Sequence, residues 1–181
     1  MQYGFTQRWK DGAKTMREAL ERARALLEDV TPLNQDCGEL CGRACCLPDE
    51  EGKGGVWLLP GEEEALKSAT WARIIAGEVP ILQCQGECDR RLRPFFCRLF
   101  PLVGIHRDGA WQVRFDRRAR PLCPLTRGGP RALSPAFVLA ARQAISLLGG
   151  DARYAPILKS WARIERRFSR RSILEAGYGA D

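Results

Sequence analysis

Cysteine is the residue type in this sequence with the clearest chemistry, because its thiolate is both a nucleophile and a metal ligand. The chain of 181 residues contains eight cysteines. They form two close groups and one separate position: Cys37, Cys41, Cys45 and Cys46; Cys84, Cys88 and Cys97; and Cys123. A short loop can direct two sulfurs at one ion, with each sulfur about 2.3 Å from a zinc ion. The spacing therefore predicts metal binding by thiolates, with loops from the two groups brought together.

The residue types leave the number of sites and the metal open. Eight thiols can fill two four-sulfur sites, or one such site with spare cysteines that are buried or redox-active. We expect the adjacent side chains of Cys45 and Cys46 to diverge, so that one of them serves a second site. Four thiolates suit both zinc and an iron–sulfur centre. His106 is the only histidine, and we expect it to be a strand residue rather than a ligand.

The apparent lack of targeting signals affects how the cysteines are interpreted. Residues 1–10 contain no basic stretch leading into an apolar run, and no apolar run approaches about 18 residues. We therefore predict neither a signal peptide nor a transmembrane helix, and we expect a cytoplasmic protein with no membrane partner. Cytosolic cysteine clusters more often bind metal or act in redox chemistry than form disulfides. Because eight is an even number, a disulfide framework is the alternative.

A second pattern surrounds the third cysteine of the downstream group, where the sequence reads Arg93-Pro94-x2-Cys97-Arg98-x-Phe100-Pro101. Together with the Cys-x3-Cys-x3-Cys-Cys segment, it resembles the YkgJ-type cysteine-cluster family. That family is described as a zinc- or iron-chelating domain that pairs a CxxCxxCC segment with a downstream RPxxCRxFP segment. The resemblance covers about residues 37–125, and the first segment differs in having gaps of three residues rather than two. A related cluster occurs in flagellin lysine methylases, so the resemblance also implies a methylation-linked alternative.

Charged and aromatic neighbours of Cys97 suggest how a site would be supported. Arg93 and Arg98 flank this cysteine, and we predict that Arg98 in particular donates N–H groups to thiolate sulfur and offsets its negative charge. Three aromatic residues in the same segment would shield the site from water, although core packing predicts the same residue types: Phe95, Phe96 and Phe100.

The overall charge invites a nucleic-acid interpretation. Lys and Arg outnumber Asp and Glu by 29 to 22, which gives a formal net charge of +7, and basic runs occur near residues 90–93, 117–120 and 163–171. Thiolate ligands would reduce this charge, and no recognition motif is present, so nucleic-acid binding is not favoured. The preferred class is a structural or carrier metal-binding protein. An iron–sulfur redox or protein-modifying enzyme comes second and a zinc-stabilised nucleic-acid-binding protein third, so enzymatic activity stays open.

Length and patterning predict one α+β domain over residues 1–181, with a cysteine core at about 34–125 and a helical C-terminal part at about 131–175. A first helix is expected from Lys14 to Val30, where Thr31-Pro32 stops it. Its apolar face is predicted to contain five residues: Met16, Leu20, Ala23, Leu27 and Val30. Residues 34–55 show no sustained periodicity, which is typical of a metal-bound loop.

The middle of the chain predicts short strands and turns. Strands are expected at 56–59 and 79–83, with a helix from Glu62 to about Gly77 between them. Residues 84–88 predict a turn between two ligands, with Gly86 at the tight position. Asp108-Gly109 between 102–106 and 111–115 predicts a hairpin. Two helices should follow, from Ser134-Pro135 to Gly149-Gly150 and from about residue 154 to 168 or beyond.

Overall fold

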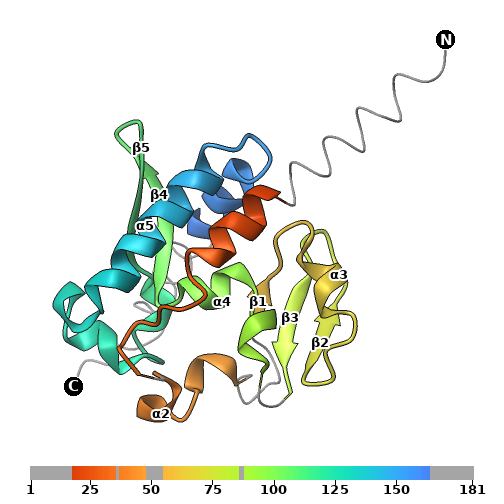
Figure 1. Cartoon of the computed structure of the whole chain (residues 1–181), viewed down its shortest axis with the longest axis horizontal. Helices are drawn as coiled ribbons and strands as arrows, with labels where there is room; N and C mark the ends of the chain where they lie inside the picture. The colour runs from red at the N-terminus through yellow and green to blue at the C-terminus, as the bar shows by residue number, and fades with distance from the viewer. Residues whose placement is uncertain (1–17, 36, 48–54, 86–87, 164–181) are drawn as a thin grey trace, which may run out of the picture.

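The computed structural model describes residues 18–35, 37–47, 55–85 and 88–163, and the described part has the predicted α+β class. Helices stand at both ends of it, and two small antiparallel sheets lie between them (Figure 1). Besides the helical residues 18–25 and 155–163, the elements are α2 (Gly38–Cys41), β1 (Val56–Trp57), α3 (Glu62–Leu66), β2 (Ala72–Ile75), β3 (Ile81–Cys84), α4 (Phe95–Leu99), β4 (Leu102–Arg107), β5 (Ala110–Phe115) and α5 (Pro135–Gly149). Short 3-10 turns occur at η1 (Ala44–Cys46), η2 (Arg90–Leu92), η3 (Arg117–Ala119), η4 (Pro124–Arg127) and η5 (Pro130–Ala132).

The larger hydrophobic core joins the helical residues 18–25, α4, the β4–β5 hairpin and α5. The predicted face of the first helix is confirmed at Leu20, Ala23 and Leu27, which are at most 2% exposed. The predicted end of this helix at Val30 is wrong. The α-helix ends at residue 25, and tighter turns follow in which the Leu27 amide donates to the Arg24 carbonyl at 3.0 Å. Residues 1–17, which include the predicted start of this helix, lie outside the described residues.

The predicted hairpin is confirmed, with β4 and β5 paired in antiparallel register from Leu102 opposite Phe115. Asp108 and Gly109 both have positive φ angles, 52° and 76°, as an Asp-Gly hairpin turn requires. The α5 helix packs across this hairpin so closely that a Cβ at Gly104 would lie 2.5 Å from Ile145. Glycine is therefore needed at the point where the sheet meets the helix.

The other sheet, hereafter the three-stranded sheet, has the strand order β1–β3–β2, and α3 lies beside it. The expected helix from Glu62 to Gly77 is wrong in its second half, because α3 ends at Leu66 and the chain then forms β2. All four residues of β2 pair with β3, with Ile74 opposite Leu82. The β-branched side chains of β2 fit this pleated surface, which outweighs their contribution to a helical pattern.

The other boundaries differ by a few residues from those predicted. The strand expected at 56–59 is paired only over β1, and the strand expected at 79–83 is β3, which extends to Cys84. The helix from Pro135 to Gly149 is confirmed, although the Ser134 side chain makes no capping hydrogen bond. The last helix is described over residues 155–163, and its predicted continuation to 168 lies outside the described residues. None of the helices in the described ranges combines the length and apolarity needed to cross a membrane.

Candidate metal centre

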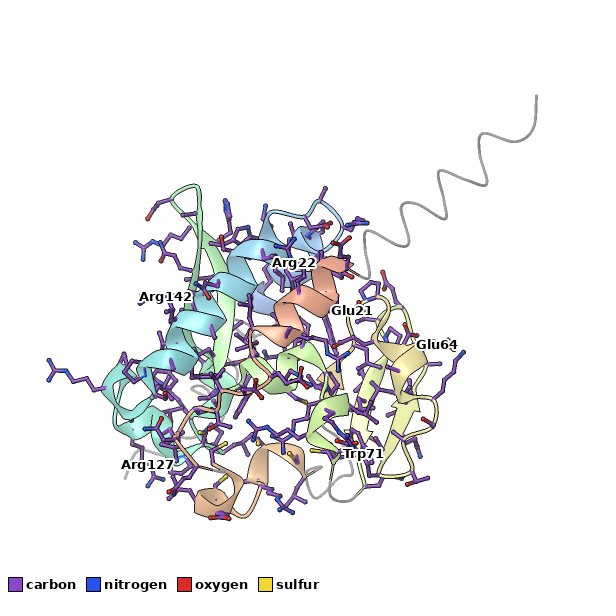
Figure 2. The ribbon with its side chains drawn as sticks, in the orientation of Figure 1. Glu21, Arg22, Glu64, Trp71, Arg127 and Arg142 are labelled. Atoms are coloured by element: carbon purple, nitrogen blue, oxygen red, sulfur yellow. The ribbon has the colours of Figure 1, made fainter. Side chains whose placement is uncertain are left out.

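Four separate segments carry the cysteines. The first group lies on α2, its N-cap and η1. Cys84 ends β3, and Cys88 follows in the same segment before η2. Cys97 lies on α4, and Cys123 is the N-cap of η4. The predicted turn at 84–88 contains Gly86 and Glu87, which lie outside the described residues, but both of its cysteines are described. Figure 2 shows the sulfur atoms, drawn in yellow, near α2 and from there toward the three-stranded sheet. All eight cysteines are free thiols.

Cys45 and Cys46 lie at the junction of the two groups. Their Sγ atoms are 3.9 Å apart, so the expectation that these adjacent side chains diverge is wrong. Both residues lie in the 3-10 turn η1. The separation resembles the sulfur–sulfur edge of a tetrahedral zinc site, about 3.8 Å when each sulfur lies about 2.3 Å from the ion.

Cys46 also reaches the second group. Hydrogen bonds from the thiols of Cys45 and Cys84 lower the pKa of Cys46 to about 3, and the charges of Arg93 and Arg43 lower it further. The same hydrogen bonds raise the pKa values of Cys45 and Cys84. These hydrogen bonds favour the thiolate form of Cys46, with one donor from each cysteine group.

A set of four cysteines, hereafter the central four, is linked by mutual electrostatic interactions: Cys46, Cys84, Cys88 and Cys97. The charge effects on Cys84 come from the other three members. Burial raises the pKa of Cys97, and the charges of Cys46 and Cys88 raise it further. Three chain segments therefore bring four thiols close enough for each to affect its neighbours. As they stand, no three His, Cys, Asp or Glu side chains in the described ranges form a ready-made metal site.

Of the remaining cysteines, Cys45 lies against Cys46, and the other three form a looser group: Cys37, Cys41 and Cys123. Cys41 contacts the Cys37 carbonyl through its sulfur at 3.7 Å, and its charge raises the pKa values of Cys45 and Cys123. Cys123 is only 8% exposed and packs in the larger hydrophobic core, where burial is the main cause of its raised pKa. The predicted set of eight cysteines is thus divided between the central four and a peripheral group that continues into the core.

Arg93 supports the sulfur atoms directly. Its Nε donates a hydrogen bond to the Cys88 Sγ at 3.0 Å, and its positive charge lowers the pKa of Cys46. This confirms that an arginine beside Cys97 donates to a sulfur of the cluster. A guanidinium in this position offsets negative charge and fixes the orientation of its partner, as groups that surround metal ligands do.

Arg98 has a different role from the one predicted. Its side chain is 8% exposed, and its N–H groups donate to three backbone carbonyls, those of Arg90 at 3.1 Å, Arg91 at 2.8 Å and Arg93 at 3.0 Å. The expectation that Arg98 donates to thiolate sulfur is therefore wrong. Arg24 donates to two of the same carbonyls at 3.2 Å. Arg98 therefore holds the η2 turn in place, and this turn positions Arg93 against Cys88.

Glu62 is a buried carboxylate that the sequence did not single out. It is 1% exposed, and its oxygens accept hydrogen bonds from the Leu59 amide at 2.8 Å and the Phe95 amide at 2.6 Å. Because Phe95 begins α4, Glu62 caps the helix that carries Cys97 from a distant part of the chain. A glutamate that opens a helix ordinarily faces solvent, so the signal in the sequence was weak.

Burial raises the pKa of Glu62 to about 7, against the opposing effect of the two amide hydrogen bonds. The unfolded chain releases this proton near pH 4.5, so between pH 4.5 and 7 the folded state holds more protons than the unfolded state. We expect the free energy of unfolding to fall by about 3 kcal/mol across this window through Glu62 alone. Urea unfolding of the wild type and of Glu62→Gln between pH 4.5 and 7.5 measures this. The wild type should lose stability relative to the variant as pH rises, and parallel curves would contradict the assignment.

The central four face a large cavity of about 1350 Å³. Six cysteines are among its lining residues: Cys37, Cys45, Cys46, Cys84, Cys88 and Cys97. Cys41 and Cys123 do not line it. The predicted aromatic shield is divided, because Phe96 and Phe100 line the cavity whereas Phe95 is fully buried in the core. His106 lies away from this site, at the exposed end of β4, where its ring packs edge-on against Trp111 at 5.2 Å.

Comparison with known proteins identified no similar protein. No family model, no curated protein and no solved structure matches this chain. The function is therefore argued from the cysteine geometry and its surroundings.

Proposed function

We propose that this chain is a metal-binding cysteine-cluster protein in which the central four hold zinc or an iron–sulfur centre. The observation that carries the proposal is that four mutually interacting cysteines, from η1, α4 and the segment that ends β3 and precedes η2, line one cavity. Soft thiolate ligands select zinc and iron–sulfur clusters over hard cations. The motif resemblance to YkgJ-type cysteine-cluster proteins supports the same class.

The donor set fits such a group chemically. Cys46 and Cys84 already share a hydrogen bond between their sulfur atoms, and Arg93 offsets the charge that additional thiolates would bring. Binding would release protons from the thiols of Cys84 and Cys97, whose raised pKa values hold them in place in the metal-free protein. When bound, zinc would hold the segments together, whereas an iron–sulfur centre would add one-electron redox chemistry.

A reducing, cytoplasmic setting belongs to the proposal, because thiolate ligands must stay reduced. The alternative class, an iron–sulfur redox or protein-modifying enzyme, gains one specific observation. Such an enzyme needs room for a substrate beside the sulfurs, and the cavity provides this room.

The proposal is tested by metal analysis of protein purified without oxygen, together with its visible absorption spectrum. One tightly bound zinc per chain, or iron with acid-labile sulfide and a broad band near ~400 nm, is the expected result. A second equivalent of metal would assign the peripheral cysteines to a second site. A protein with no metal that cannot be loaded with zinc or reconstituted with iron and sulfide would refute the proposal.

A further inference from the structure

The cavity is larger than a metal centre requires. Four sulfurs about 2.3 Å from one ion enclose only a small fraction of it, and pockets of roughly 300–1000 Å³ already hold organic ligands of ordinary size. At about 1350 Å³, the cavity has room for a metal centre and a small molecule together. The lining residues away from the sulfurs therefore indicate what that molecule would be.

Positive charge dominates this lining. Among the described residues that line the cavity, seven are arginines and a single one, Asp116, is a carboxylate. Arg118 already neutralises Asp116, since its backbone amide donates to the Asp116 carboxylate at 2.9 Å and its guanidinium at 2.5–3.1 Å. Arg117 and Arg120, hereafter the arginine pair, lie in the same turn and are exposed to solvent. The seven arginines of the lining therefore outnumber Asp116 and the acidic Cys46, and three of the seven, Arg117, Arg118 and Arg120, are close together in the chain.

Aromatic rings form part of the same wall. Trp161 stacks on Phe96 with ring centroids 4.7 Å apart, and its centroid lies 5.1 Å from that of Trp57. The guanidinium of Arg118 lies 3.8 Å from the Trp161 centroid, which places a cation on the aromatic group. Trp71 also lines the cavity; it directly precedes β2, whose first residue, Ala72, lies opposite Cys84 (Figure 2). Planar apolar surface and positive charge are therefore combined in one enclosure.

We propose that this cavity binds a small organic phosphate that carries an aromatic ring. Guanidinium groups recognise phosphate through paired N–H donors. The arginine pair in one turn suits a phosphate dianion better than a ligand with a single carboxylate charge. The ring of the ligand would pack on Trp57 or Trp71, because Phe96 and the Arg118 guanidinium already contact the Trp161 ring. This inference goes beyond metal binding and does not depend on which metal is bound.

The test uses 1-naphthyl phosphate as the probe, and quenching of tryptophan fluorescence in the full-length, metal-loaded protein as the readout. Two comparison compounds each lack one feature: 1-naphthol has no phosphate, and inorganic phosphate has no ring. We expect the probe to bind at least about ten-fold more tightly than either compound, because both parts of the site contribute. Equal affinity for 1-naphthyl phosphate and 1-naphthol would overturn the proposal, since charge would then play no part.

Variants locate the binding. Replacing the arginine pair, Arg117→Ala with Arg120→Ala, should weaken probe binding by about ten-fold. The matched control removes two exposed arginines that do not line the cavity, Arg127→Ala with Arg142→Ala (Figure 2), and should leave binding unchanged. If the double replacement at the arginine pair folds poorly, the two single replacements should each show a smaller loss in the same direction. An equal loss in the control, or no loss at the arginine pair, would overturn the proposal.

The outcome is separable from that of the metal proposal. Probe binding by a chain that cannot be loaded with metal would uphold this inference and refute the metal proposal. Metal loading without selective binding of the probe would uphold the metal proposal and refute this inference.

Discussion

Replacement of Cys46 by serine is expected to weaken the tightest metal site by roughly 100- to 1000-fold. Structural zinc sites bind with an apparent free energy of about 10–16 kcal/mol, so that one of four thiolates accounts for about 3 kcal/mol. Cys46 should show the full loss because its sulfur accepts hydrogen bonds from both cysteine groups. A serine hydroxyl cannot replace this thiolate, since it stays protonated at neutral pH. Competition against a chromophoric chelator measures the affinity.

The matched control is Cys123→Ala, which removes a cysteine that lies in the hydrophobic core and does not line the cavity. The metal affinity of the tightest site in this variant should stay within about three-fold of the wild-type value. The free energy of unfolding should fall by about 1 kcal/mol because the replacement leaves a small cavity. Equal loss of affinity in both variants would show that the central four are not the primary ligands.

Replacement of Arg98 by alanine is expected to lower the free energy of unfolding by about 3–5 kcal/mol. The variant loses three hydrogen bonds from a charged donor to backbone carbonyls, each worth about 1.5–3 kcal/mol but not additive. It leaves those carbonyls without one of their donors, and the turn that presents Arg93 to Cys88 should loosen. Metal affinity should therefore fall together with stability. Urea unfolding and chelator competition measure the two effects.

Arg91→Ala is the control, because this residue lies in the same turn but its side chain is 83% exposed and pairs with Asp89 at the surface. Its backbone carbonyl, which Arg98 needs, is unchanged by the replacement. The free energy of unfolding should change by no more than about 0.5 kcal/mol. A comparable loss in both variants would mean that the turn depends on general charge rather than on the buried guanidinium.

The sequence predicted those elements whose signals are local. Asp108-Gly109 identifies its hairpin because the turn residues alone select the geometry, and Pro135 with Gly149 bounds α5 for the same reason. The strand β2 was missed because its only reason to be extended is its pairing with β3, which no local pattern encodes. Its apolar residues also fitted the end of a helix.

The candidate site divides in the same way. The cysteine spacing and the Arg93-Pro94 motif predicted which segments hold the sulfurs and that an arginine donates to one of them. The partners of Arg98 are carbonyls of a turn that only the folded chain brings to it. Glu62 is 33 residues before the amide it caps, and the excess of arginines around the cavity arises from three segments far apart in the chain. Such contacts depend on tertiary structure rather than on motif spacing.

The segment that carries the first cysteine group is less buried than the helix that carries Cys97. Neither α2 nor η1 contains a buried residue, whereas α4, which carries Cys97, has four. Regions with few buried apolar contacts open at a small fraction of the cost of global unfolding. The segment of α2 and η1 can therefore open locally, away from α4, while the rest of the structure stays folded. Metal could thus be handed to or taken from the protein on the timescale of a local fluctuation rather than that of unfolding.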